Sequence, residues 1–407
     1  MRKLHSIAVA LVCCSLAASA ALAQQKTISD PAEYNAYMAA LNTADPAQKA
    51  AAMEAFVVKF PASVVKVDAL EQAMAAYQQA GNTAAVEKIA RQVLQAAKDN
   101  VRALALLTFL ERTKAAQGDK PALAEMQAHA QQGVAALKTW QKPDGTSDAD
   151  FAKLRVQMDG IFNGALGFAA MQAKDYAKAR DAYLKAVKAD PANLQDVYQL
   201  GIAELEMNPV DPNGFWHVAR AIGLANNQKR ADAAKSVDAY GRAKYKRYHG
   251  SDDGWDAVVK QAAAGAAPPK DFAKSITAAP TPAEIAVQAV HDNDPGSLSF
   301  GDMEFILALR DASPANKDAA ERVWRALQQR VANTPLKIQV KVIAATATTI
   351  EAAISDDNQK AGKADLHVVM AKPLDKLPAP GTLVNVVGRI SDYTPAPFMF
   401  TMIQGQI

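Results

Sequence analysis

The fold is decided by residues 161–191, which read IFNGALGFAAMQAKDYAKARDAYLKAVKADP. Apolar and small residues recur at helical spacing in both halves, around Gly167 in the first and around Tyr183 in the second. Asp175 interrupts this pattern between the halves. Pro191 ends the second half, because proline disfavours a helical conformation in the residue before it. The stretch therefore predicts two antiparallel helices joined by a short turn.

This unit resembles the tetratricopeptide repeat. Gly201 follows Gly167 by 34 residues, which is the length of that repeat. The positions that match the family's pattern of large, small, aromatic and proline residues are Leu166, Gly167, Tyr176, Ala179, Tyr183, Ala186 and Pro191. Asn163 stands where the family has tryptophan, and Ala170 stands where it has an aromatic residue. The resemblance implies a stack of hairpins, because one hairpin cannot bury its own apolar face.

The flanking sequence predicts further hairpins with a less regular pattern. Residues 31–60 and 101–138 each contain two helical stretches, and a unit around Tyr77 and Gly81 matches the repeat in part. We therefore expect a mainly α protein, an α-α hairpin solenoid followed by a small β domain. The predicted segments are degenerate hairpins at 24–140, clearer repeats with a capping helix at 150–250, a short helix with an Ala- and Pro-rich linker at 251–283, a helical block at 284–334 and the β domain at 335–407.

The predicted capping helix is rich in basic residues. The basic side chains of 228–249 are interleaved with Tyr240, Tyr245 and Tyr248. They are Lys229, Arg230, Lys235, Arg242, Lys244, Lys246 and Arg247. Such a stretch either binds an anionic surface or an acidic partner, or forms one solvated face of a helix, and we favour the solvated face.

After Pro335 the apolar period changes from helical to alternating. The first of five short alternating segments contains Ile338, Val340 and Val342. These segments predict a small antiparallel barrel or sandwich, in which Gly388 permits a bend or bulge. Their number and spacing resemble the OB-type barrel. Seven basic and six acidic residues in 336–407 argue against nucleic acid as the ligand of this domain.

The first 23 residues have the three parts of a secretory signal peptide. Arg2 and Lys3 form the basic start, residues 7–16 form the apolar centre, and Ala23 ends a small-residue cleavage site. We therefore expect cleavage after Ala23 and a periplasmic or secreted protein without a transmembrane segment. Cleavage removes both cysteines, which excludes disulfides, thiolate metal sites and cysteine nucleophiles. It also removes two basic residues and no acidic one from a chain of net charge +3, and the resulting +1 argues against a nucleic acid partner.

The sequence after the predicted cleavage site contains no catalytic or metal-binding motif that we recognise. Its histidines are His129, His217, His249, His291 and His367, and none is spaced from another as paired metal ligands are. Residues 249–255 bring His, Ser and Asp together only in sequence, and we interpret them as a helix boundary with Asp252 or Asp253 as the N-cap. We therefore expect no enzymatic activity, no cofactor and no metal.

The tetratricopeptide resemblance implies a scaffold that binds a partner protein or peptide. In that family the first helix of each hairpin lines a concave groove. The corresponding positions here are Gly164, Phe168, Met171 and Gln172 in one unit, and Tyr198, Ile202, Leu205 and Glu206 in the next. Phe168, Met171 and Tyr198 either anchor an apolar part of the partner or are buried between hairpins. The sequence does not identify the partner.

The alternative hypothesis is a module that binds cell-wall polymer or another carbohydrate through the β domain. Tyr393, Phe398 and the loop 394–397 would then stack on sugar rings. Sedimentation of residues 336–407 with cell-wall polymer distinguishes this hypothesis from the scaffold.

Overall fold

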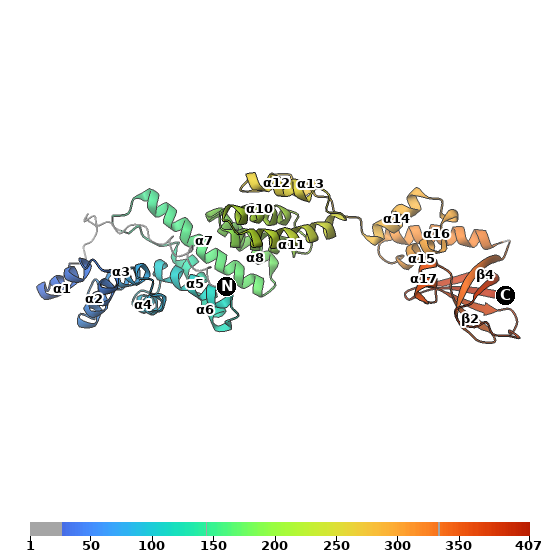
Figure 1. Cartoon of the computed structure of the whole chain (residues 1–407), viewed down its shortest axis with the longest axis horizontal. Coiled ribbons are helices and arrows are strands. Elements are labelled where there is room, and N and C mark those ends of the chain that lie inside the picture. Colours follow the sequence, from blue (N-terminus) through green and yellow to red (C-terminus); the bar gives the residue numbers. More distant parts are fainter. Residues whose placement is uncertain (1–26, 144, 333) are drawn as a thin grey trace. The chain divides into compact units, whose positions relative to one another are not determined.

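The computed structural model describes residues 27–143, 145–332 and 334–407. These residues form seventeen α-helices and five β-strands, and the chain divides between Ala278 and Ala279 into two compact units (Figure 1). The first unit is helical and the second combines helices with a barrel, which confirms the predicted helical solenoid followed by a small β barrel. The predicted signal peptide, with both cysteines and the cleavage site at Ala23, lies outside the described residues.

The first unit is a stack in which helices that follow one another along the chain pack together. Helix hairpins are formed by α3 with α4, by α5 with α6, by α7 with α8, and by α9 with α10. The helices are α1 (Pro31–Leu41), α2 (Pro46–Lys59), α3 (Lys66–Gln79), α4 (Thr83–Ala96), α5 (Val101–Ala115), α6 (Lys120–Ala136), α7 (Asp148–Gln172), α8 (Tyr176–Ala189), α9 (Leu194–Leu205), α10 (Asn213–Asn227), α11 (Ala231–His249), α12 (Trp255–Ala264) and α13 (Phe272–Ser275).

Polar residues in the breaks between helices begin most of them. At each N-cap a side-chain oxygen accepts a hydrogen bond from a backbone N–H of the first turn, which has no partner inside the helix. These caps are Asp30, Asp45, Asn82, Asn100, Asp119, Ser147, Asp175 and Asn193. Local residues therefore determine where the helices begin after these turns, including the turn at Asp175 within residues 161–191.

Gly167 sets the distance between α7 and α8. A Cβ atom at this position would lie 2.9 Å from ring carbons of Tyr183, which is fully buried. Gly201 has the same role between α9 and α10, where a Cβ atom would lie 2.8 Å from the backbone nitrogen of Val218. The small residues of the repeat pattern are therefore points of close helix approach.

Three clusters of buried apolar side chains follow one another along this stack. The first joins α1 to α5, the second joins α5 to α7, and the third joins α8 to α13. The third contains Phe272 and Ile276. The segment predicted as a linker at 251–283 therefore packs in part on the hairpins, because these two apolar side chains anchor it.

The predicted helix boundary at 249–255 is present, but its N-cap prediction was wrong. The residue in the N-cap position of α12 is Gly254, with φ at 92°. That left-handed conformation favours glycine, whereas Asp252 and Asp253 instead interact with Arg242 and Ser251.

The second unit contains four α-helices, one 3₁₀ helix and the barrel. Its helices are α14 (Pro282–Asp292), η2 (Pro295–Ser297), α15 (Phe300–Ala308), α16 (Pro314–Ala332) and α17 (Asp356–Ala361). Its strands are β1 (Leu336–Ala345), β2 (Thr349–Ala353), β3 (Leu366–Met370), β4 (Leu383–Pro395) and β5 (Phe398–Gln406). All five strands coincide with the alternating segments of the sequence.

The barrel closes in the order β1-β2-β3-β5-β4. Four neighbouring pairs are antiparallel, and β3 with β5 is parallel. An odd number of strands cannot form a closed ring in which every neighbour is antiparallel, so a parallel pair is required. The register between β4 and β5 shifts around Gly388, which confirms the irregularity predicted there.

The helical block and the barrel share one hydrophobic core. Leu327 of α16 is fully buried, and the rings of Phe300 on α15 and Phe400 on β5 lie 6.0 Å apart. Glu304 of α15 also accepts hydrogen bonds from Ser355, the N-cap of α17, and from Asn358 within α17. Across the described ranges, no helix combines the length and apolarity needed to span a membrane.

Candidate functional site

The residues selected from the sequence as groove positions lie on α7 and α9, the first helices of two successive hairpins, with Glu206 at the C-cap of α9. Phe168, Met171, Tyr198, Ile202 and Glu206 are partly exposed, and Gln172 is exposed. Gly164 and Leu205 are buried, so their side-chain positions belong to the interior. Leu205 is covered by the start of α10, where a Cβ atom on Gly214 would lie 2.6 Å from Leu205 Cγ.

Arg112 of α5 connects two of these helices at Gly164. Its Nη2 donates a hydrogen bond to Oδ1 of Asp196 on α9 at 2.6 Å, and its guanidinium lies 5.9 Å from the ring centre of Phe168. A Cβ atom at Gly164 would lie 2.8 Å from Arg112 Nη1, so glycine leaves the space that this side chain fills. Asp196 is buried and Arg112 is partly exposed. The predicted positions Gly164 and Phe168 therefore meet at a charged residue that the sequence did not indicate.

A second group joins α9 to α11. The rings of Tyr198 and Tyr240 meet edge to face with centres 5.9 Å apart. Glu206 accepts hydrogen bonds from the Tyr240 hydroxyl at 3.4 Å and from Lys244 Nζ at 2.6 Å. Burial, and then the negative charge of Glu206, raise the pKa of Tyr240, so its hydroxyl stays protonated as a donor.

These two groups, together with Met171 on α7 and Ile202 on α9, define the first-helix surface. Its members are Arg112, Phe168, Met171, Tyr198, Ile202, Glu206, Tyr240 and Lys244. It combines partly exposed rings and aliphatic groups with charges that are already paired inside the protein. Arg and Tyr are among the residues that most often supply binding energy in protein interfaces. Of these members, Arg112, Tyr240 and Lys244 were not selected from the sequence as groove positions.

Two of the seven basic residues of the segment 228–249 pair with carboxylates of the protein. Arg242 forms ion pairs with Asp238, Asp252 and Asp256, and Lys244 pairs with Glu206. The other five are exposed, namely Lys229, Arg230, Lys235, Lys246 and Arg247. Tyr245 is buried in the same helix. These contacts favour the interpretation of 228–249 as a helix with one solvated face.

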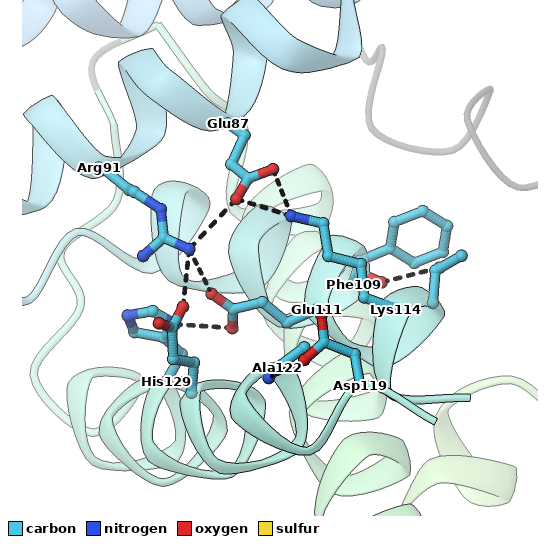
Figure 2. A network of polar contacts seen from close by, with 10 residues as sticks. Glu87, Arg91, Phe109, Glu111, Lys114, Asp119, Ala122 and His129 are labelled. Carbon is cyan, nitrogen blue, oxygen red and sulfur yellow. Dashed lines mark hydrogen bonds and ion pairs between the residues drawn. The ribbon is translucent and has the colours of Figure 1, made fainter. Parts of the chain in front are cut away.

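A separate network of charges lies where α4, α5 and α6 meet (Figure 2). Arg91 Nη2 contacts Glu87, Glu111 and Glu125 at 3.2, 3.3 and 2.7 Å. Lys114 Nζ also pairs with Glu87 at 2.8 Å. Arg91 of α4 therefore contacts carboxylates of α5 and α6, and Lys114 of α5 contacts a carboxylate of α4. These ion pairs fix the α3–α4 hairpin against the α5–α6 hairpin.

Glu111 is the buried member of this network. His129 Nδ1 lies 2.8 Å from Glu111 Oε2, and the Glu111 side chain is 1% exposed (Figure 2). Burial raises the pKa of Glu111, although His129 and Arg91 act in the opposite direction. A carboxyl group with a raised pKa beside a histidine is a common active-site arrangement, but neither cavity described for this chain is lined by these residues. The network is therefore a joint between hairpins.

The remaining histidines also have one polar partner each. His217 contacts Glu204, His367 contacts Glu351, His291 contacts Asp292, and His249 contacts the carbonyl of Thr277. Within the described part of the chain no three His, Cys, Asp or Glu side chains are placed to hold a metal ion together.

The two rings that the carbohydrate hypothesis selected in the β domain are both engaged within the second unit. The ring centres of Tyr393 and Trp324 on α16 lie 4.9 Å apart, and the Tyr393 hydroxyl accepts a hydrogen bond from Arg310. Phe398 is buried and packs against Phe400 of the same strand. Neither ring is presented as a free stacking platform. Among known proteins, no family model and no curated protein matches the chain.

Proposed function

We propose that this protein is an exported, non-enzymatic scaffold of the tetratricopeptide type that binds a partner protein or peptide along the first-helix surface. The main support is the arrangement of partly exposed Phe168, Met171, Tyr198 and Ile202 on α7 and α9, beside Arg112. Apolar side chains in such a row suit the anchors of an extended peptide or of an amphipathic helix.

Two further observations support this proposal. The close approaches at Gly167 and Gly201 are those that the tetratricopeptide pattern requires. In the β domain, the Tyr393 ring packs against Trp324 of α16 and the Phe398 ring is buried beside Phe400, which disfavours the carbohydrate alternative.

The test is to isolate partners from an envelope extract with the protein lacking residues 1–23, and then to measure the affinity of one purified partner. We expect Phe168→Ala combined with Tyr198→Ala to weaken that affinity at least tenfold, because both substitutions remove partly exposed apolar surface. The matched control is Leu184→Ala on α8, a side chain that is 44% exposed on a second helix. It should leave the affinity unchanged.

Two outcomes would contradict the binding proposal. One is an unchanged affinity for the double variant. The other is loss of folding in the double variant, seen by thermal denaturation, because the rings would then be core residues.

Export is tested independently of binding. The proposal that residues 1–23 are a signal peptide predicts that protein recovered from the envelope begins at Gln24. N-terminal sequencing of that protein measures this directly, and recovery of the uncleaved chain would refute it.

A further inference from the structure

An open cavity of about 590 Å³ lies beside the start of α5. Its walls come from α3, from the α4–α5 connection and from the segment after α6. The lining residues on which the inference depends are Glu71, Lys98, Asp99, Asn100, Arg102 and Trp140. The volume falls in the range of roughly 300–1,000 Å³ that is usual for small-molecule sites. None of these residues belongs to the first-helix surface.

One wall of the cavity is a set of planar hydrogen-bonding groups that hold one another in place. Glu71 accepts hydrogen bonds from Asn100 Nδ2 and, at 3.3 Å, from Arg102 Nη1. Asn100 Oδ1 also accepts the Ala103 N–H as the N-cap of α5. The carboxylate, amide and guanidinium groups are therefore oriented before any ligand arrives, which lowers the entropic cost of binding.

The lining also includes an aromatic ring. Trp140 is half-buried and lies edge-on to Phe151, with ring centres 5.1 Å apart. That contact with the start of α7 restrains the orientation of the indole. The large ring supplies apolar contact area in a cavity whose other named walls are polar.

The rim supplies free polar groups of both signs. Among the described residues, no side chain pairs with the Lys98 ammonium or the Asp99 carboxylate, and both side chains are exposed. The Lys98 backbone carbonyl accepts a hydrogen bond from Gln132 Nε2 at 2.8 Å. Together with Glu71 and Arg102, the two exposed side chains give two positive and two negative charges, so the cavity has no net charge. An isolated phosphate would face two carboxylates here, and a metal cation would face two basic groups.

We propose that this cavity binds a neutral saccharide. A pyranose ring has an apolar C–H face that matches Trp140 and a ring of hydroxyl groups that both donate and accept hydrogen bonds. Asp99 and Glu71 accept such bonds, and Arg102 and Lys98 donate them. The aromatic plane and the planar polar groups thus match the two chemical faces of one sugar unit.

The experiment is a calorimetric titration of the protein without residues 1–23 with three soluble oligosaccharides: tetramers of N-acetylglucosamine, of β-linked glucose and of α-linked glucose. We expect saturable binding of at least one. Trp140→Ala should weaken it at least tenfold, and Trp140→Phe, which keeps a ring, should stay within about threefold of the wild type. Asp99→Ala should also weaken binding, whereas Asp375→Ala, an exposed carboxylate of the second unit, should not.

The result is separable from the scaffold proposal. The Phe168→Ala and Tyr198→Ala double variant should bind the oligosaccharide as the wild type does. Absence of saturable binding to all three oligosaccharides would overturn the saccharide assignment. An affinity that Trp140→Ala and Asp99→Ala leave unchanged would overturn it as well, and so would binding of a zwitterionic dipeptide in place of every saccharide.

Discussion

The carboxylate partners of Arg91 show that burial and ion pairing shift a glutamate pKa in opposite directions. Glu87 is partly exposed and paired with Lys114 and Arg91, which lower its pKa. Glu111 has the same Arg91 as a partner, yet burial raises its pKa. The difference follows from the desolvation of Glu111, whose side chain is 1% exposed against 22% for Glu87.

These two shifts give opposite dependences of stability on pH. The stabilisation associated with Glu111 is present below the ordinary glutamate pKa of about 4.3 and is lost as the pH rises through its raised folded-state pKa. The stabilisation from Glu87 is present at neutral pH and is lost as the pH falls through its lowered folded-state pKa. The free energy of unfolding of the wild type minus that of Glu111→Gln should therefore increase from pH 7 to pH 4.5. The corresponding difference between the wild type and Glu87→Gln should decrease below about pH 4.5.

Urea denaturation of the wild type and both variants between pH 3.5 and 7.5 measures these differences. Each variant serves as the control for the other, because both remove one carboxylate from the same network. Parallel pH profiles for the wild type and Glu111→Gln would show that Glu111 titrates as it does in the unfolded chain.

At the scale of helices and strands, local sequence patterns predicted most of the turns and strand faces, which depend on residues close together in the chain. The turn at Asp175 and the alternation around Val340 are examples, because turns and strand faces are set within a few residues. The cap at Gly254 was missed because a left-handed φ leaves no pattern beyond the glycine itself.

The candidate site was predicted less completely. Phe168 and Tyr198 were selected because the repeat pattern assigns their helix faces. Arg112 was missed because it meets Asp196 across 84 residues, and no local pattern signals that distance. The burial of Leu205 was also not evident, since it depends on how the segment after α9 returns α10 onto it.

The packing of α7 on α8 gives a prediction at this scale. Gly167→Ala should destabilise the protein by about 1–3 kcal/mol, because the added methyl group would overlap the buried ring of Tyr183. Gly223→Ala in α10 is the matched control. Its methyl group would lie 3.5 Å from the nearest atom, Cα of Ala263, so the better helix propensity of alanine should stabilise the protein by about 0.5–1 kcal/mol.

Chemical denaturation followed by circular dichroism measures both free energies of unfolding. Equal effects of the two substitutions would mean that Gly167 is not a point of close helix approach.

Over the whole molecule, each unit has its own hydrophobic core. The clusters of the first unit end with Ile276, and the cluster that joins α14–α16 to the barrel begins with Ala286. In the first unit the clusters succeed one another along the stack, as in repeat proteins whose stability comes from contacts between neighbouring hairpins. In the second unit the barrel and the helices share one cluster, so neither is expected to fold without the other.

This division predicts that residues 24–278 and 279–407 fold as separate proteins. Each fragment should unfold cooperatively, because cutting between Ala278 and Ala279 leaves every buried cluster intact. A fragment of 336–407, which lacks α14–α16, should not fold, because it would expose the side of the core that Leu327 and Met303 now fill. Thermal denaturation and two-dimensional NMR spectra of the three fragments measure this. A folded 336–407 would show that the barrel is stable without its helices, and an unfolded 279–407 would show that the second unit depends on the first.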